Sequence, residues 1–271
     1  MKRMPALAPI KELVRDHCGL SFEDGRETLL AEGIRTRQEK RGIASLDAYL
    51  DVLSRDAVEV GRLVSLITVN ETYFFREAAH FAILVEKLIP ELWASRGGLG
   101  RLKIVCAGCS TGEEPYTIAI ALQEKFGPGF GSRISVVGFD IDAEALDKAR
   151  QGLYAAHSFR GVPERIRATH FAPEGSRYRI NETCRRAVTF VAQNICGDTY
   201  AEALSDVDVL FYRNVSIYFQ PDVQQRIFRN LAGLLHEQGY LFLSSTETFC
   251  HNIGVLSLLE RDGIFLYRKG V

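Results

Sequence analysis

At Cys106-Ala107-Gly108-Cys109-Ser110-Thr111-Gly112-Glu113-Glu114-Pro115-Tyr116, a short apolar run gives way to a helical segment. The run at 102–106 predicts a buried strand, and the residues from about 113 to 125 predict a helix. Gly108 and Gly112 allow close backbone approach in the turn between them, and the helix start offers unpaired amide groups. A strand, a glycine turn and a helix in this order predict an α/β fold whose ligand binds outside the carboxyl ends of the strands.

The composition of this turn excludes two common phosphate-binding motifs. Gly108 and Gly112 do not fit the spacing G-x-G-x-x-G, and the lysine of a P-loop does not follow the second glycine. Glu113 and Glu114 stand instead where a phosphate would approach. Because two carboxylates would repel a pyrophosphate, the turn predicts a ligand that carries ammonium or sulfonium groups.

A second acidic position follows the next predicted strand, at 134–139. Asp140 stands at the end of this strand, where a carboxylate can accept hydrogen bonds from both hydroxyls of a ribose. A helix N-cap is the alternative role for either Asp140 or Asp142, and we assign it to Asp142, which precedes a helical segment at 143–151.

Helices and strands alternate through the C-terminal part of the chain, which we predict to be one domain at 81–271. The main elements are a helix at 78–95 that ends at Gly97-Gly98 and further strands at 207–212, 239–244 and 264–268. Such alternation predicts a mainly parallel sheet with helices on both faces. One interruption stands out: strand-like runs at 178–180 and 187–190 flank the polar pair Asn181-Glu182, which predicts a short antiparallel β insert at about 172–189.

The N-terminal residues 1–66 show only helical periodicity, and they predict an all-helical domain of four helices. Ser45 and Ser54 are candidate N-caps for the third and fourth helices. Residues 67–80 then form a linker between the two domains.

The composition is that of an ordinary globular protein. The 271 residues include 33 Lys+Arg and 34 Asp+Glu, and the net charge of −1 disfavours a dedicated nucleic-acid binder. The chain lacks an apolar run near the ~18 residues of a membrane span, and charges interrupt the apolar positions near its start. These features predict a cytoplasmic protein that does not insert into the membrane.

The cysteines and histidines show no spacing typical of a metal site. Cys106 and Cys109 match the C-x-x-C redox pattern, but they lie inside the glycine turn and no second pair completes a zinc site. We therefore predict no metal and free thiols in a reducing compartment. The cysteines are Cys18, Cys106, Cys109, Cys184, Cys196 and Cys250.

Five segments together resemble the S-adenosylmethionine-dependent methyltransferase fold and, more narrowly, the bacterial chemotaxis receptor methyltransferases (the CheR family). Their order and spacing agree with that family over nearly the whole chain. The segments are Thr68-Val69-Asn70-Glu71-Thr72-Tyr73-Phe74-Phe75-Arg76-Glu77, Ser110-Thr111-Gly112-Glu113-Glu114-Pro115-Tyr116, Asp140-Ile141-Asp142, Gln193-Asn194-Ile195 and Tyr212-Arg213-Asn214-Val215-Ser216-Ile217-Tyr218-Phe219.

The resemblance implies methyl transfer from S-adenosylmethionine to receptor glutamates, giving methyl esters and S-adenosylhomocysteine. It implies that Glu114 binds the methionyl ammonium, that Asp140 binds the ribose, and that Asn194 and Ile195 contact the adenine. The implied catalytic residues are Arg76, which orients the target carboxylate, and Tyr218. The implied cofactor-binding residues are Asn70, Thr72, Arg76, Gly108, Glu114, Asp140, Asn194, Ile195, Arg213 and Asn214.

Several residues keep an alternative role. Arg76 could form an exposed ion pair with Glu77 or another acid, and Asn194 could be an ordinary turn residue. Phe74 and Phe75 are expected to dock the helical domain. Ser216 replaces an aliphatic residue of the family pattern, and we expect it to face solvent or the cofactor.

The resemblance also implies a partner, the cytoplasmic methylation helices of chemotaxis receptors, with recruitment to membrane receptor arrays. The short insert favours a member that does not depend on a receptor tether peptide, and we expect a monomer. A cluster of basic residues in the helical domain is either a solvated face or a surface that attracts acidic receptor helices. The cluster consists of Arg26, Arg35, Arg37, Lys40 and Arg41.

A glutamate acceptor is already ionised near neutral pH, so the reaction requires no strong general base. The lack of a convincing catalytic His or Cys in the sequence fits this chemistry. Two rival functions stay open at this point: a small-molecule O-methyltransferase, and a non-catalytic cofactor-binding regulator of a chemosensory pathway.

Overall fold

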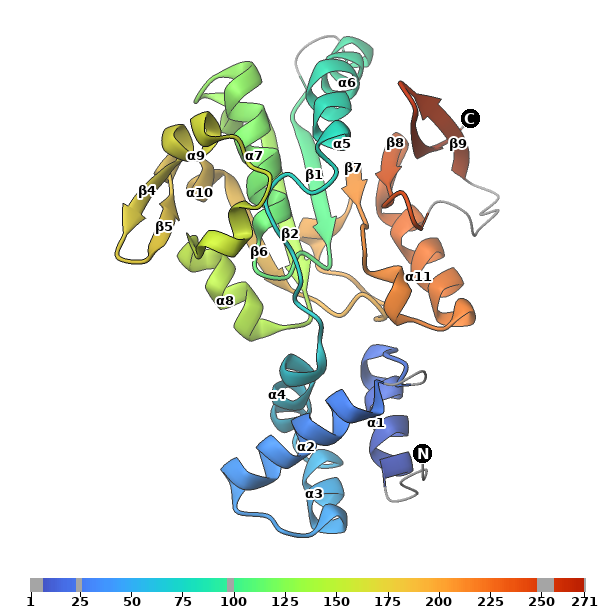
Figure 1. The fold of residues 1–271 in the computed structure, drawn as a ribbon. Helices are drawn as coiled ribbons and strands as arrows, with labels where there is room; N and C mark the ends of the chain where they lie inside the picture. The colour runs from blue at the N-terminus through green and yellow to red at the C-terminus, as the bar shows by residue number, and fades with distance from the viewer. Residues whose placement is uncertain (1–6, 23–25, 97–99, 248–255, 271) are drawn as a thin grey trace.

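Four helices form the N-terminal part of the computed structural model, which describes residues 7–22, 26–96, 100–247 and 256–270. They are α1 (Ala8–Cys18), α2 (Glu27–Arg41), α3 (Leu46–Leu53) and α4 (Ala57–Ile67). Their apolar faces meet in one core that includes the fully buried Ile10, Leu30, Tyr49 and Leu63. Figure 1 shows this helical domain below the larger domain, joined to it by an extended linker.

The structure confirms one of the two predicted helix caps in this domain and corrects the other. The Ser45 hydroxyl accepts a hydrogen bond from the Ala48 amide, as expected of an N-cap of α3. Asp56, not Ser54, caps α4, and its carboxylate accepts from the Glu59 amide at 3.0 Å. Ser54 still has helical backbone angles and donates to the Asp51 carbonyl, so it closes α3 instead.

The larger domain contains a seven-stranded sheet in the order β6-β2-β1-β7-β8-β10-β9 (Figure 1). The first five strands of this order are parallel, and the last two are antiparallel. The predicted mainly parallel sheet is therefore confirmed, whereas β9 was not expected. The strands are β1 (Leu102–Ala107), β2 (Ile134–Asp140), β6 (Val188–Ala192), β7 (Val207–Phe211), β8 (Leu235–Phe242), β9 (Leu256–Arg261) and β10 (Ile264–Lys269).

Helices connect these strands and pack on the sheet. α7 packs on β1 and β2, α8 on β2 and β6, and α11 on β8. Their bounds are α7 (Glu113–Phe126), α8 (Ala143–Gln151) and α11 (Pro221–Leu234).

The helix expected at 78–95 is divided into α5 (Ala78–Ile83), a π-helical turn (Leu84–Leu88) and α6 (Ile89–Ser95). Pro90 stands in the first turn of α6. Because proline has no amide hydrogen and its ring crowds the carbonyl four residues earlier, the regular α-helical pattern is lost just before it. Gly97 and Gly98, expected to end this helix, lie outside the described residues.

The small β insert exists, but its strands pair differently from the prediction. It is a three-stranded sheet of β3 (Leu153–Tyr154), β5 (Arg177–Ile180) and β4 (Phe171–Glu174). The run expected as its second strand is β6, which joins the main sheet beside β2. Asn181 is not in a hairpin turn: its side chain caps α10 (Glu182–Ala187) by accepting from the Cys184 amide. A short helix, α9 (Glu164–His170), precedes β4.

The aromatic residues of the linker dock on the larger domain rather than on the helical domain. The Phe74 ring lies 4.8 Å from Tyr154, 5.3 Å from Phe159 and 4.9 Å from Phe171, measured between ring centroids. The Phe75 ring contacts Phe81 of α5. The linker is thereby anchored to the domain that carries the sheet.

Candidate active site

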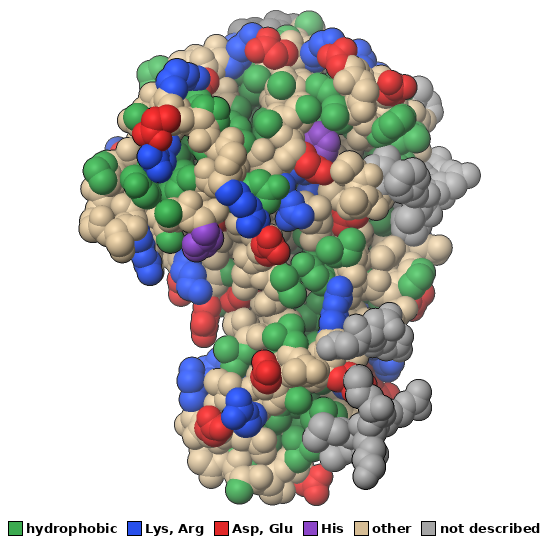
Figure 2. Space-filling view, viewed as in Figure 1, with side chains coloured by type: hydrophobic (Ala, Val, Ile, Leu, Met, Phe, Trp, Pro, Cys, Tyr) green, Lys and Arg blue, Asp and Glu red, His purple; other side chains and the backbone are tan. Residues whose placement is uncertain are grey.

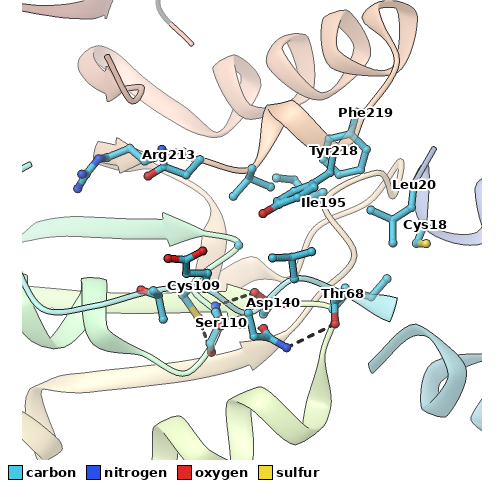
Figure 3. Close-up of a pocket in the computed structure, with 18 of the residues that line it drawn as sticks. Cys18, Leu20, Thr68, Cys109, Ser110, Asp140, Ile195, Arg213, Tyr218 and Phe219 are labelled. Carbon is cyan, nitrogen blue, oxygen red and sulfur yellow. Dashed lines mark hydrogen bonds between the residues drawn. The ribbon is translucent and has the colours of Figure 1, made fainter. Parts of the chain in front are cut away.

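A pocket that opens to solvent lies between the strand ends, the linker and the helical domain. Figure 3 shows Asp140 and Ser110 on one side of it and Tyr218 and Ile195 on the other. All ten residues predicted to bind the cofactor line this pocket, and so does Tyr218. They are Asn70, Thr72, Arg76, Gly108, Glu114, Asp140, Asn194, Ile195, Arg213 and Asn214.

Two of the acidic residues that line the pocket, Glu114 and Asp140, are the carboxylates predicted to bind the cofactor. One Glu114 oxygen accepts from Arg213 Nη1 at 3.0 Å, and burial raises the pKa of Glu114 although Arg213 opposes the shift. Asp140 accepts from the amides of Ser110 at 2.7 Å and Asp142 at 2.9 Å. Burial also raises the pKa of Asp140.

Glu113 lies in the first turn of α7 and does not join Glu114 in the pocket. Its carboxylate is buried on the other side of the turn, where it accepts from the hydroxyls of Thr111 at 2.6 Å and Ser158 at 3.0 Å. Consecutive residues of a helix point about 100° apart, which separates the two side chains. Of these two glutamates, only Glu114 therefore lines the pocket.

Gly108 is required by both its conformation and its surroundings. Its φ of +72° lies in the left-handed region, and a Cβ there would stand 2.7 Å from a methyl group of Val215. The predicted close approach of backbone segments in the turn is thus present.

The linker is held to the turn by side-chain hydrogen bonds. The Asn70 amide donates to Asp142 at 2.8 Å, and the Ser110 hydroxyl donates to the Asn70 oxygen at 2.7 Å. Asp142 also caps α8 by accepting from the Glu144 and Ala145 amides, which confirms its predicted N-cap role. The contacts between Asn70 and these two residues were not foreseen, because they join positions 40 and 72 residues apart.

Arg213 is buried at the centre of an ionic cluster. Besides Glu114, it contacts a Glu77 oxygen at 2.8 Å and donates to the carbonyl of Arg76 at 2.5 Å. Glu77 has a φ of +58° and also accepts from the hydroxyl of Ser245 at 2.7 Å. Glu77 was considered only as a partner of Arg76, so its part in this cluster was missed.

Arg76 does not form the alternative ion pair with Glu77. Its Nη1 donates to the Glu71 carbonyl at 3.4 Å, and its guanidinium lies 5.7 Å from the centre of the Tyr73 ring. Among the described residues, no carboxylate pairs with Arg76. Its guanidinium is therefore available to a carboxylate ligand at the pocket.

Tyr218 lies in the 3-10 turn Ser216–Tyr218 that follows β7. The Arg26 guanidinium of the helical domain stands 4.8 Å from the centre of its ring and also donates to the Ile217 carbonyl at 3.3 Å. Burial raises the pKa of Tyr218, although Arg26 and Arg76 act in the opposite direction. The phenol is neutral at physiological pH and can donate a hydrogen bond.

The side chain of Asn194 behaves as the turn residue that was held as its alternative role. Its oxygen accepts from the Cys196 amide at 2.9 Å, and its nitrogen donates to the His17 carbonyl at 2.6 Å. Ile195 is buried beside it at the pocket wall.

Ser216 faces neither solvent nor the pocket, which corrects the expectation for this position. It is buried, and its hydroxyl donates at 2.8 Å to Glu247, a residue that sequence reasoning did not single out. The amide of Asn214 donates to the same carboxylate at 2.6 Å.

The helical domain supplies one wall of the pocket, which the sequence did not predict. Leu20 and Cys18 lie at one end of the pocket in Figure 3, and Arg213 lies at the other. The Ser21 amide donates to the Tyr218 carbonyl at 3.3 Å, and Leu20 forms an isolated antiparallel bridge with Phe219.

The predicted basic cluster of the helical domain is not a single surface. Arg37 is buried and makes two hydrogen bonds of 2.8 Å to Glu59, which also accepts from the Tyr49 hydroxyl at 3.1 Å. Arg26 lies against Tyr218. Arg35 and Lys40 are exposed on α2. Figure 2 shows basic and acidic side chains interspersed over the face that it draws.

Cys106 and Cys109 are buried free thiols, and burial raises the pKa of both. Within the described ranges, which omit Cys250, no three or more His, Cys, Asp and Glu side chains gather as metal ligands would. None of the helices that the structure describes combines the length and apolarity of a membrane span.

Comparison with known proteins identifies two family models along the chain. Residues 5–68 match the all-alpha domain of CheR methyltransferases, and residues 70–263 match their SAM-binding domain.

Three curated relatives span most of the chain. Chemotaxis protein methyltransferase 2 of Pseudomonas aeruginosa is 32% identical over 89% of this chain and 86% of its own length. The chemotaxis protein methyltransferase of Escherichia coli is 30% identical over 89% and 84%, respectively. A relative from Pseudomonas putida named "Probable biofilm formation methyltransferase WspC" is 33% identical over 93% of this chain and 57% of its own length.

Proposed function

The chain belongs to the CheR methyltransferase family, and we propose that it methylates glutamate side chains of chemotaxis receptors with S-adenosylmethionine as donor. The fold expected from the sequence, an all-helical domain before a methyltransferase domain, is confirmed by the two family models. The proposed product is a glutamate methyl ester, which is the basis of sensory adaptation. For the domain limits, we propose a helical domain at 1–66, a linker at 67–80 and a methyltransferase domain at 81–271.

The pocket fits S-adenosylmethionine because its charged groups match those of the cofactor. Glu114 is suited to the methionyl ammonium and Asp140 to the ribose hydroxyls, whereas the apolar Ile195 suits a face of the adenine. Asn70 and Gly108 would hold the glycine turn against the cofactor. The remaining predicted residues, Thr72, Arg76, Asn194, Arg213 and Asn214, would form the rest of the pocket wall. When bound, the cofactor supplies an electrophilic methyl group.

Arg76 is the residue that we propose to orient the attacking glutamate. Its planar guanidinium can donate two parallel hydrogen bonds to a carboxylate, and no described carboxylate already occupies it. Tyr218 would donate a hydrogen bond near the reacting groups. Holding the carboxylate in line with the methyl group can supply on the order of 7–11 kcal/mol of the rate enhancement in favourable cases.

One observation carries this proposal: Arg76, with which no described carboxylate pairs, lines the same pocket as Glu114 and Asp140. A cationic donor and an anionic acceptor would each find an oppositely charged partner there. A small-molecule O-methyltransferase would not need the helical domain, and a non-catalytic regulator would not need Arg76.

For the partner, we propose the cytoplasmic methylation helices of the receptors and recruitment of a monomeric enzyme to their membrane arrays. The short β4–β5 hairpin is the basis for proposing that no tether peptide is required. Binding of a receptor C-terminal peptide to the purified protein would contradict this last proposal.

The function is tested with tritiated S-adenosylmethionine and membranes that contain chemotaxis receptors. We expect label on the receptor and release of volatile methanol on treatment with base, because carboxyl esters are base-labile. Labelled metabolites without labelled receptor would support the small-molecule rival. Cofactor binding without any transfer would support the regulator.

A further inference from the structure

A buried carboxylate outside the pocket joins the ends of β7 and β8. Glu247 is 4% exposed, and donors surround both of its oxygens. One oxygen accepts from the amide of Ser216 at 2.9 Å and from its hydroxyl at 2.8 Å. The other accepts from the Asn214 amide at 2.6 Å, the Ser244 amide at 3.2 Å and the Ser244 hydroxyl at 2.6 Å.

The segment that Glu247 binds has an unfavourable backbone conformation at Asn214. Asn214 has a φ of +59°, which lies in the left-handed region that non-glycine residues rarely adopt. The amides on both sides of Val215 donate to Glu247, so the carboxylate brackets that residue. Val215 lines the pocket and packs closely on the turn at Gly108.

We propose that Glu247 is a positioning residue that holds Asn214 and Val215 in place against the cofactor. It does not line the pocket and acts only through the residues that do. All five of its described side-chain hydrogen bonds come from donors, and a carboxylate is the side chain that can accept from all of them. This inference rests on the proposed function, because Asn214 is assigned there to the cofactor site.

The test compares Glu247→Gln with the wild-type chain. Glutamine has the same size, but its amino group would face donors and could accept from none of them. We expect the affinity for S-adenosylhomocysteine, measured by titration calorimetry, to fall more than ten-fold and receptor methylation to fall with it. Ser216→Ala removes one of the hydrogen bonds and should weaken the affinity two- to five-fold. The matched control Glu237→Gln changes an exposed glutamate of β8 and should leave the affinity unchanged.

Thermal unfolding separates positioning from general stabilisation. A carboxylate that only stabilised the fold would lower the unfolding temperature but leave the affinity of the folded protein unchanged, and that result overturns the proposal. If Glu247→Gln does not fold, Ser216→Ala carries the test, and an affinity equal to that of the wild type overturns the proposal. If the wild-type protein binds S-adenosylhomocysteine but does not methylate receptors, this result would instead contradict the proposed function.

Discussion

Arg76 and Glu77 are neighbours in the chain with different surroundings. Glu77 turns into the ionic cluster of Arg213, where it meets one guanidinium and the hydroxyl of Ser245. Arg76 contributes its carbonyl to that cluster, while its side chain remains at the pocket. The left-handed backbone at Phe75 and Glu77 brings about this division. Instead of the alternative ion pair between the two residues, Glu77 pairs with Arg213, and no carboxylate of the described residues pairs with Arg76.

Replacing Arg76 by alanine should reduce turnover far more than cofactor affinity. Loss of charge-assisted hydrogen bonds to a carboxylate costs about 1.5–3 kcal/mol, so we expect kcat to fall roughly 10- to 100-fold. Tyr218→Phe should act in the same direction with a smaller effect. Steady-state methylation and calorimetry with S-adenosylhomocysteine measure the two quantities. Arg229→Ala, at an exposed position of α11, is the control, and an equal loss of affinity and turnover would contradict the proposed role.

Cofactor affinity should fall as the pH is lowered from about 7.5 to 5.5. Burial raises the pKa values of Glu114 and Asp140, so these carboxyls take up protons at a higher pH than ordinary ones do. A neutral Glu114 attracts the ammonium group less strongly. Calorimetry across this range measures the effect, and Glu114→Gln should bind weakly with a flatter pH dependence. An affinity that rises toward acid pH would exclude these groups as the binding carboxylates.

Among the elements, α2 differs most from its expected role. The predicted basic face is divided by Arg37, which turns inward to Glu59 and ties α2 to α4. Arg41 also approaches Glu59, at 3.7 Å. Arg35, Lys40 and Arg41 are exposed, but Arg41 lies within 3.7 Å of Asp56 and Glu59, so Arg35 and Lys40 are the better candidates to meet a partner.

Reversing both exposed charges, as Arg35→Glu with Lys40→Glu, should weaken receptor methylation several-fold at low ionic strength. The effect should shrink at about 0.5 M salt, because screening removes attraction between exposed charges. Affinity for S-adenosylhomocysteine should stay unchanged. Arg101→Glu with Arg229→Glu gives the same change in net charge elsewhere and serves as the control. Equal rates of receptor methylation for the two double variants at low salt would show that α2 does not take part in receptor docking.

The start of α4 offers a test of the corrected cap. Asp56→Ala removes the acceptor for the Glu59 amide and should destabilise the protein by about 1 kcal/mol. Ser54→Ala should change the free energy of unfolding by less than about 0.5 kcal/mol. Urea denaturation followed by circular dichroism compares them. A larger loss for Ser54→Ala than for Asp56→Ala would restore the original assignment.

The two domains meet at the pocket, so cofactor binding depends on how they dock. Gly19 stands at this junction with a φ of +75°, and a Cβ there would lie 2.6 Å from the sulfur of Cys196. Asn194 and Tyr218 form hydrogen bonds to backbone groups of the helical domain nearby. Cys18 and Leu20 flank Gly19 and line the pocket, so a shift of the helical domain at Gly19 would move this wall of the pocket.

Gly19→Ala should therefore weaken cofactor binding, by several-fold or more, because the added carbon pushes the helical domain away from Cys196. Gly42→Ala is a matched control, since Gly42 also has a left-handed φ, +66°, but no atom within 4 Å of an added Cβ. Both variants carry the same backbone strain, of order 1–2 kcal/mol. Only Gly19→Ala should alter the affinity for S-adenosylhomocysteine, and equal affinities would show that docking is not coupled to the pocket.

Most patterns within one segment were read correctly because their physical cause is local, although Asp56 makes the cap that was assigned to Ser54. Ser45 and Asp142 cap the helices that follow them, and the predicted strands β1, β2 and β7 form as expected, because caps and apolar runs act over a few residues. The family resemblance also allowed the pocket residues to be predicted, since its motifs place the candidate residues at strand ends.

The other errors arose where a residue has partners far along the chain. Phe74 packs on a sheet about 80 to 100 residues away, Ser216 finds Glu247, and β6 pairs with β2 instead of the insert. Periodicity specifies that a residue is apolar or that a segment is extended, but many distant partners satisfy the same pattern. Local sequence thus specified the elements, the glycine turn and the acidic character of the site. The pairing of strands, the inward turn of Arg37 and the contribution of the helical domain to the pocket required the folded chain, because burial and hydrogen bonding over long separations select one partner among many.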